Sequence, residues 1–167
     1  MKGGLKMKTK EKEHVGMKGW IKIDHFDKSG NMIESVETPN VVVDAGFQEV
    51  AGLFCSDQAG SYTAFDYIGV GTGTTAATYT DTALEAEITD SGLARAASTG
   101  TLVTETVAYD TAQFVHQYSV TDTQAVTESA VFNASSDGTM LCHQTFSAIN
   151  VADGDTLQIT WKVTVAR

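Results

Sequence analysis

Alternating apolar and polar residues near the C-terminus predict the clearest β-strand of the chain. Over residues 157–165 every second residue is apolar and the residues between them are polar. Successive side chains of a strand point to opposite faces, so this alternation predicts one buried side and one side in water. Less regular patterns predict further strands over 14–26, 32–38, 65–70, 93–98, 101–109, 112–121, 126–133 and 139–146. Short strands at a spacing of about ten residues are typical of an antiparallel sandwich or barrel.

One segment departs from the strand pattern and predicts a helix. Asp44 is a favourable N-cap residue. Apolar residues then recur at helical spacing, at Phe47, Val50, Ala51 and Phe54. We therefore expect a helix over 44–55 that packs this stripe on a sheet. A weaker pattern predicts a short helical turn over 80–88.

Turn-forming residues separate the predicted strands. Clusters of Asp, Asn, Ser and Gly at 27–31, 133–138 and 153–155 predict tight connections. Thr99-Gly100 predicts a further tight turn. Pro39 is expected to end the second strand, because proline cannot donate to a ladder.

These patterns together predict a mainly β protein. We expect a single antiparallel β-sandwich, jelly-roll-like, over 14–167, with one short α-helix and an extended basic N-terminal arm over 1–13. The composition agrees, since 42% of residues are apolar, only 19% are charged and 23 are Thr. No apolar run is long enough to predict a membrane span. The predicted core consists of Trp20, Ile21, Ile23, Phe47, Phe54, Ile68, Phe114, Tyr118, Phe132, Leu157, Ile159 and Trp161.

Charge divides the chain into a short basic segment and an acidic remainder. Residues 1–12 carry five Lys and one Glu, a net charge of +4, and the other residues carry six basic and twenty acidic groups, a net charge of −14. An acidic body repels phosphate backbones, so we expect no nucleic-acid partner. The basic segment suits an acidic protein surface, and a solvated tail is the alternative. The candidate interaction residues are Lys2, Leu5, Lys6, Met7, Lys8, Lys10 and Lys12.

The glycine-rich stretch at 69–75 does not predict a nucleotide site. No Lys follows it to complete a Walker loop, and the third glycine of a dinucleotide fingerprint is replaced by Thr74. We expect instead a strand exit that passes so close to its neighbours that a Cβ would clash.

The remaining reactive residues do not form a recognisable catalytic or metal motif. The four histidines (His14, His25, His116 and His143) lack the spacing of zinc ligands. Adjacent residues of a strand face opposite sides, so Cys142 and His143 are expected to point apart. Cys55 and Cys142 are expected to be buried free thiols, although a disulfide between them stays open. Carboxylate pairs such as Glu85 and Glu87 arise by chance in an acidic chain, so we expect no enzyme, no metal and no cofactor.

Several stretches occur in a suggestive order along the chain. They are residues 38–46 (TPNVVVDAG), 67–76 (YIGVGTGTTA), 80–87 (TDTALEAE), 128–133 (ESAVFN) with 138–141 (GTML), and 155–163 (DTLQITWKV). This order resembles small structural proteins of tailed bacteriophages and prophages. In such proteins a Gly-Thr-Gly loop precedes a Thr-Asp-Thr-Ala-Leu segment, and a final strand follows a Gly-Asp turn.

The resemblance implies a virion protein made in the host cytoplasm. The favoured role is a capsid decoration protein that binds the major capsid protein or other virion proteins as a homo-oligomer, by analogy a trimer. The first alternative is a tail fibre or tail-tip component, which could bind a carbohydrate or receptor through exposed aromatic rings. For that role the candidates are Tyr62, Phe65 and Tyr79, unless these rings plug the ends of the sandwich. The second alternative is an enzyme such as a glycan hydrolase.

Overall fold

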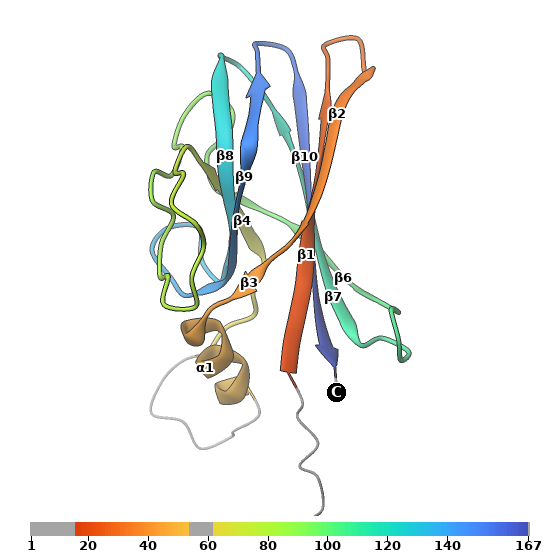
Figure 1. The fold of residues 1–167 in the computed structure, drawn as a ribbon, viewed down its shortest axis with the longest axis vertical. Helices are drawn as coiled ribbons and strands as arrows, with labels where there is room; N and C mark the ends of the chain where they lie inside the picture. Colours follow the sequence, from red (N-terminus) through yellow and green to blue (C-terminus); the bar gives the residue numbers. More distant parts are fainter. Residues whose placement is uncertain (1–15, 54–61, 167) are drawn as a thin grey trace, which may run out of the picture.

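Two antiparallel five-stranded sheets face each other in the computed structural model, which describes residues 16–53 and 62–166 (Figure 1). Sheet A contains, in spatial order, β2 (Met32–Pro39), β1 (Gly16–Phe26), β10 (Thr156–Ala166), β7 (Thr111–Ser119) and β6 (Thr99–Val103). Sheet B contains β3 (Val41–Val42), β9 (Met140–Val151), β8 (Gln124–Phe132), β4 (Tyr67–Gly71) and β5 (Ala96–Ala97). The predicted antiparallel sandwich is therefore confirmed.

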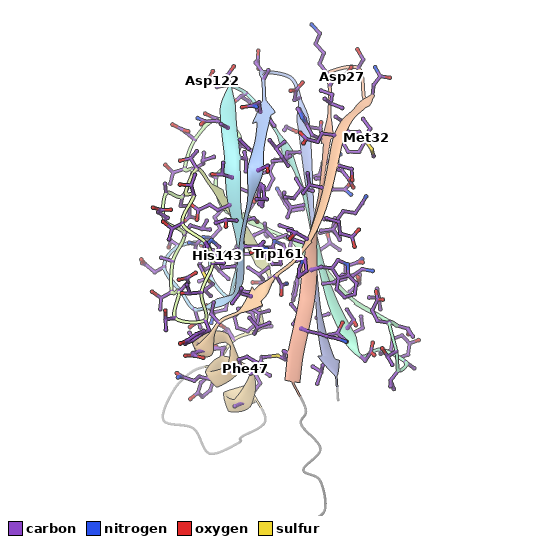
Figure 2. The ribbon with its side chains drawn as sticks, viewed as in Figure 1. Asp27, Met32, Phe47, Asp122, His143 and Trp161 are labelled. Atoms are coloured by element: carbon purple, nitrogen blue, oxygen red, sulfur yellow. The ribbon has the colours of Figure 1, made fainter. Side chains whose placement is uncertain are left out.

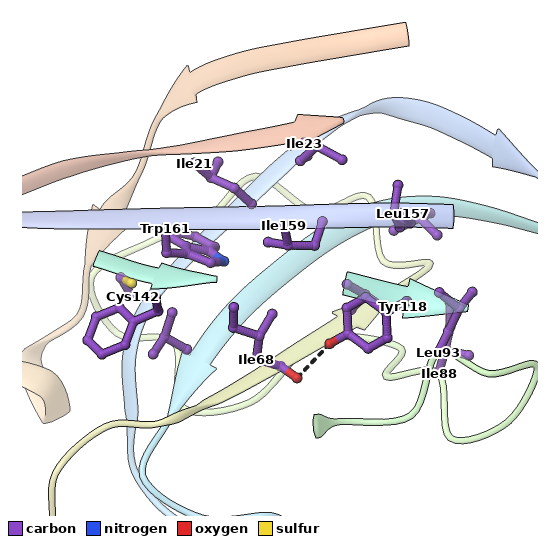
Figure 3. Close-up of a cluster of buried hydrophobic side chains, with 14 of the residues drawn as sticks. Ile21, Ile23, Ile68, Ile88, Leu93, Tyr118, Cys142, Leu157, Ile159 and Trp161 are labelled. Atoms are coloured by element: carbon purple, nitrogen blue, oxygen red, sulfur yellow. Dashed lines mark hydrogen bonds between the residues drawn. The ribbon is translucent and has the colours of Figure 1, made fainter. Parts of the chain in front are cut away.

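The inner faces of the two sheets form the main core. Trp161 at the centre of β10 is completely buried, and its Nε1 donates a hydrogen bond of 3.2 Å to Ser129 Oγ on sheet B. Tyr118 crosses the core in the same way and donates a hydrogen bond of 2.7 Å to the Ile68 carbonyl (Figure 3). Both aromatic side chains thus satisfy their polar atom while they bury a large ring. The alternation of β10 is confirmed from Leu157 to Val163.

Two residues of the predicted core lie elsewhere. Trp20 is half-buried on the outer face of sheet A, because it alternates with the inward-facing Ile21. The ammonium of Lys162 lies 5.4 Å from the centre of the Trp20 ring. Phe47 is 42% exposed, and Phe54 lies outside the described residues. The other predicted core residues are buried.

The helix α1 (Asp44–Leu53) is confirmed in position, but its fully buried face differs from the predicted one, of which Val50 is half-buried against the core while Phe47 and Ala51 are exposed. Its buried residues are Gly46, Glu49 and Gly52. The two glycines allow close contact, because a Cβ at either position would collide with Leu141 or with the ring of Tyr62. This close approach outweighs the burial of Phe47.

Within the described residues, no helix has the length and apolar character needed to cross a membrane.

Buried hydrogen bonds explain the inward position of Glu49. Its carboxylate accepts a hydrogen bond of 2.8 Å from the Thr63 amide and one of 3.0 Å from Asn133 Nδ2. The helix is thereby connected to the turn between β8 and β9 through a polar contact. Apolar periodicity alone could not have indicated this arrangement.

Between β4 and β7 the chain differs from the sequence prediction. Residues 99–100 do not form a tight turn, because β5 belongs to sheet B and β6 to sheet A, and the chain passes between the sheets at Ser98. The strand predicted over 101–109 ends at Val103.

The loop that follows β6 is held by Asp110, whose carboxylate accepts hydrogen bonds from the amides of Glu105, Thr106 and Val107. These bonds lower the pKa of Asp110 to about 2.

A long connection over residues 72–95 adds a third layer on the outer face of sheet B (Figure 1). It contains no helix, so the turn predicted over 80–88 is wrong. Leu84 of this connection packs with residues of sheet B in a second buried cluster, which also contains Val43, Ala130, Phe132 and Met140. Strand β8 is therefore covered on both of its faces.

We expect Trp161→Ala to be among the most destabilising single substitutions. The ring is fully buried, and the substitution leaves a cavity and removes the hydrogen bond that Ser129 Oγ accepts from Nε1, so the free energy of unfolding should fall by about 3–5 kcal/mol. Chemical denaturation followed by fluorescence measures this loss. Trp20→Ala is the matched control and should cost clearly less, because that ring is half-buried on the outer face. A loss below about 1 kcal/mol for Trp161→Ala would contradict the buried position.

Candidate functional site

A buried carboxylate lies at the centre of the interface between sheet B and the connection 72–95. Glu128 of β8 has no exposed surface. Its Oε1 accepts hydrogen bonds from the amides of Gly73 at 2.9 Å and Ala86 at 2.8 Å. Its Oε2 accepts another from the Glu85 amide at 3.0 Å. The Glu128 side chain thus fixes the connection at two places, at Gly73 and at Glu85–Ala86.

His143 on the neighbouring strand β9 joins this carboxylate to a second one. Its Nε2 lies 3.2 Å from Glu128 Oε2, and its Nδ1 lies 2.8 Å from Asp81 Oδ2. A histidine donates through both nitrogens only when it is protonated. The geometry therefore fits an imidazolium between two carboxylates, on the outer side of sheet B and away from Trp161 (Figure 2).

The pKa directions of these groups are consistent with that charge state. Burial favours the neutral form of His143, but its hydrogen bonds to Glu128 and Asp81 prevail and raise its pKa. Burial likewise opposes ionisation of Glu128, yet the hydrogen bonds from His143 and from three backbone amides lower its pKa. For Asp81, burial is outweighed by hydrogen bonds from Thr78 and His143, and the pKa is lowered.

The amides of the glycine-rich loop are occupied by carboxylates of the protein itself. Gly73 donates to Glu128, and the amides of Thr74 and Thr75 both donate to Glu85 Oε2 at 2.8 Å. The hydrogen bond from Thr75 is the main cause of the lowered pKa of Glu85. A loop of this kind can bind an anion through successive amides. Here that anion is supplied from within the chain.

Close packing of this loop was correctly predicted from its glycines. A Cβ added at Gly71 or Gly73 would collide with the Glu128 carboxylate. Both positions are buried, and larger side chains would displace Glu128 from its amide partners. The glycines therefore serve packing around a charge, which agrees with the prediction of a tight strand exit.

An ion pair closes the other end of the connection. Arg95 binds Glu87 through two parallel hydrogen bonds of 2.7 Å. Its Nη1 also donates to the carbonyl of Asp137 at 2.7 Å, in the turn between β8 and β9. The guanidinium lies 3.5 Å from the centre of the Phe132 ring, a cation–π contact. Arg95 thus joins the connection to sheet B.

The cluster of Asp81, His143 and Glu128 is built to hold structure. Both ring nitrogens of His143 are engaged as donors, so no lone pair is free to accept a proton from a substrate. Glu128 is saturated with donors and His143 is 3% exposed, so a substrate has no access to either. The arrangement can carry buried charge and fix a loop.

The described residues contain no group of three or more side chains arranged to hold a metal ion. Cys142 and His143 point to opposite sides of sheet B, as predicted, with Cys142 in the main core. Cys142 is a buried free thiol, and burial raises its pKa. Cys55 lies outside the described residues.

The three aromatic candidates for carbohydrate binding have different environments. Phe65 is 8% exposed and belongs to the main core, so it closes the sandwich. Tyr62 lies against Gly52 of α1. Tyr79 is 64% exposed, and of the three it has the freest ring.

The surface of the described residues includes a shallow hollow and an apolar groove. The first is shallow and is lined by Trp20 with Gly19, Glu37, Thr38 and Pro39. The second, which we name the α1-end groove, is an apolar groove of about 400 Å³ between α1 and the end of sheet A. The predicted interaction residues of the basic arm, from Lys2 to Lys12, lie outside the described residues.

The buried cluster was not predicted as a unit. Glu128 lies within an otherwise mostly apolar strand that is buried on both faces, and a charge in that setting requires partners. That signal indicated a buried carboxylate, but not that His143 would be its neighbour. The pairing of β8 with β9 brings the two residues together.

Three of the stretches that carry the phage resemblance meet at this cluster. The loop 71–75, the segment 80–87 and the strand residues 128–133 contact one another through Glu128 and His143. No family model, no curated protein and no solved structure matches the chain.

We expect the stability of the protein to be greatest between about pH 4.5 and 6.5. The raised pKa of His143 stabilises the fold fully below the unfolded pKa of about 6.5, and this contribution is lost as the pH rises through the folded pKa. The lowered pKa values of Glu128 and Asp81 act in the opposite direction, and their contribution is lost as the pH falls below about 4. Urea denaturation at several pH values measures both slopes.

His143→Gln provides the control for the alkaline slope. The variant lacks the titrating ring, so the difference in unfolding free energy between it and the wild type should shrink from pH 6 to pH 8. A difference that stays constant over this range would show that His143 does not bind an extra proton in the folded state.

We expect Glu128→Gln to destabilise the fold by about 3 kcal/mol. The amide group places an NH₂ where the carboxylate accepted hydrogen bonds from Glu85 and His143, and it removes the charge that faces His143. Thermal or urea denaturation measures the loss. Glu85→Gln is the matched control and should cost clearly less, because that side chain is exposed. Equal losses in the two variants would contradict the central role of Glu128.

Proposed function

We propose that this chain is a non-enzymatic structural protein of a tailed-phage virion, a capsid decoration protein that binds the head surface as a homo-oligomer. The observation that carries the proposal is the meeting of the loop 71–75, the segment 80–87 and the strand residues 128–133 around one buried carboxylate. Stretches that resemble the phage proteins are therefore parts of one packed unit. A resemblance made of interacting parts has more weight than one made of scattered short matches.

The use of the polar groups supports a structural role. Glu128, His143 and Asp81 are engaged with one another, and Glu85 is engaged with loop amides. These are the groups that an enzyme would need to leave free in a cleft. In this chain they fix a connection on the outside of a sandwich, which suits a protein selected for a durable surface.

The distribution of apolar and charged residues supports assembly with other proteins. Exposed apolar side chains gather at the α1 end, where Leu53, Leu102, Tyr109 and Val165 are between 47% and 71% exposed and line the α1-end groove. Apolar patches of this kind mark interaction sites. The opposite charges of residues 1–12 and of the remainder favour contact between copies or with an acidic neighbour. A trimer is the assembly suggested by analogy with small virion proteins.

A tail-tip module that binds a carbohydrate is the second candidate, and one observation favours it. The shallow hollow on the outer face of sheet A combines the half-buried ring of Trp20 with Glu37 and Pro39. An aromatic platform beside hydrogen-bonding groups suits a sugar ring. Tyr79 offers a further exposed ring, although it lies on the connection between β4 and β5.

Binding to separated heads and tails of the phage that encodes the chain tests the proposal. We expect the intact protein to bind heads, and binding should weaken as salt rises, because screening shortens the reach of charge from about 10 Å at 0.1 M to about 3 Å at 1 M. A variant without residues 1–12 should bind at least about tenfold more weakly, a loss of roughly 1.4 kcal/mol. Co-sedimentation with purified particles measures both effects.

Two outcomes separate the candidates. Trp20→Ala should leave head binding unchanged, since the hollow is not part of the proposed attachment. Binding to tails that is lost in Trp20→Ala would contradict the decoration role and support the tail-tip candidate. Unchanged head binding by the truncated chain would show that the basic arm takes no part.

A further inference from the structure

The α1-end groove exists because the inner face of sheet A extends beyond the part that sheet B covers. The inward-facing row continues through Val163 and Met17 to Val165, and on the neighbouring strands through Ala112 to Leu102. Yet Val165 is 51% exposed and Leu102 is 64% exposed. Within residues 16–53 and 62–166, no layer faces these inward-directed side chains.

Other elements complete the walls of this groove. Helix α1 contributes Val50 and Leu53, and the loop before β7 contributes Tyr109. The floor consists of the apolar residues Ala64, Phe65, Phe114 and Leu141. Among the described residues that line the groove, Asp110 is the only charged one. The groove therefore suits apolar side chains presented by an extended segment or a helix.

The free edge of β6 lies beside the groove. In the described part of the chain, β6 is the last strand of sheet A and pairs only with β7. An unpaired edge offers a row of backbone donors and acceptors to another strand. A strand added at this edge would direct alternate side chains to the inner face, next to Leu102.

The N-terminal segment has the pattern that such an added strand requires. Leu5 and Met7 alternate with Lys6, Lys8 and Lys10. In an extended conformation the apolar pair would face the groove and the lysines would face water or an acidic surface. We propose that the N-terminal arm of a second copy of this chain adds to the free edge of β6 and places Leu5 and Met7 in the α1-end groove.

A second copy fits this arrangement better than the chain's own arm. Strand β1 begins at Gly16, beside the groove-lining Met17, and it is separated from β6 by β10 and β7. To reach its own β6 edge, the arm would have to cross sheet A and then turn sharply. Residues 8–15 contain no Gly, Pro, Asn, Asp or Ser, the residues that form tight turns. Extended, these eight residues span about 26 Å, which is enough to reach a neighbouring molecule.

Electrostatics favours the same exchange. Residues 1–12 carry a net charge of +4, and the remaining residues carry −14, so each body attracts the arm of another copy. Every copy has one arm and one groove, which allows a closed ring of head-to-tail contacts. The inference deepens the proposed function and rests on it only in requiring more than one copy.

Sedimentation velocity of the full chain and of two variants tests the exchange. Leu5→Asp with Met7→Asp removes the apolar anchors, and Leu102→Asp places a charge on the edge strand beside the groove. Each variant should dissociate to monomers, with the dissociation constant raised at least about tenfold. Ile33→Asp is the matched control, because Ile33 is 58% exposed in β2, next to Met32 at the end of the molecule opposite to Phe47 (Figure 2). It should leave the oligomer unchanged.

Mixing the two variants distinguishes arm exchange from other contacts. The Leu102→Asp chain keeps an intact arm and the Leu5→Asp, Met7→Asp chain keeps an intact groove, so an equimolar mixture should form heterodimers. A mixture that stays monomeric, a wild-type chain that is monomeric, or a Leu102→Asp chain that keeps the wild-type oligomer would overturn the inference. Unfolding curves of each variant verify that its fold is intact.

The outcome is separable from that of the proposed function. A chain that exchanges arms but binds neither heads nor tails would support the exchange and contradict the virion role. A monomeric wild-type chain whose binding to heads is lost in Leu102→Asp would keep the virion role, and it would assign the groove to a capsid partner instead of a second copy.

Discussion

The third layer of this protein depends on one buried negative charge. Glu128 is placed where a water-free environment would make an isolated carboxylate costly, and the structure compensates with three backbone amides and an imidazolium. Because those amides belong to residues 73, 85 and 86, the charge determines the path of a connection that lacks helices and has few strand contacts. Removal of the Glu128 carboxylate would deprive three backbone amides of their acceptor and His143 of one of its two carboxylate partners.

Two kinds of interaction therefore hold the protein together, apolar packing between the sheets and ionic contacts outside sheet B. Between the sheets, apolar side chains pack around Trp161 and Tyr118, and the indole Nε1 and the phenol hydroxyl of these two residues each donate one hydrogen bond. Outside sheet B, the connection is held mostly by ionised groups, from Asp81 to Arg95. The apolar packing around Trp161 and Tyr118 is insensitive to pH near neutrality, whereas the ionic contacts of the connection 72–95 depend on the protonation of His143. Changes of pH should therefore loosen the outer layer before the sheets separate.

The sequence was sufficient for the sheets but not for the layer that covers them. Strict alternation identified β10, and turn residues identified the hairpin between β1 and β2. Helical spacing located α1 but indicated the wrong face, because close contact through Gly46 and Gly52 and the hydrogen bonds of Glu49 outweighed the burial of Phe47. The cluster around Glu128 joins residues up to 62 positions apart. Local patterns carry no information about such contacts, since they depend on which strands become neighbours.

The order in which the strands of sheet A are made has a consequence for synthesis on the ribosome. Strand β10 lies between β1 and β7, and its pairing with β1 joins Gly16 to Ala166. One edge of β1 therefore stays unpaired until β10 has left the ribosome. Until then β1 exposes an apolar face and an open edge, so the nascent chain is vulnerable to aggregation. Folding of sheet A should accordingly be completed only after β10 has left the ribosome.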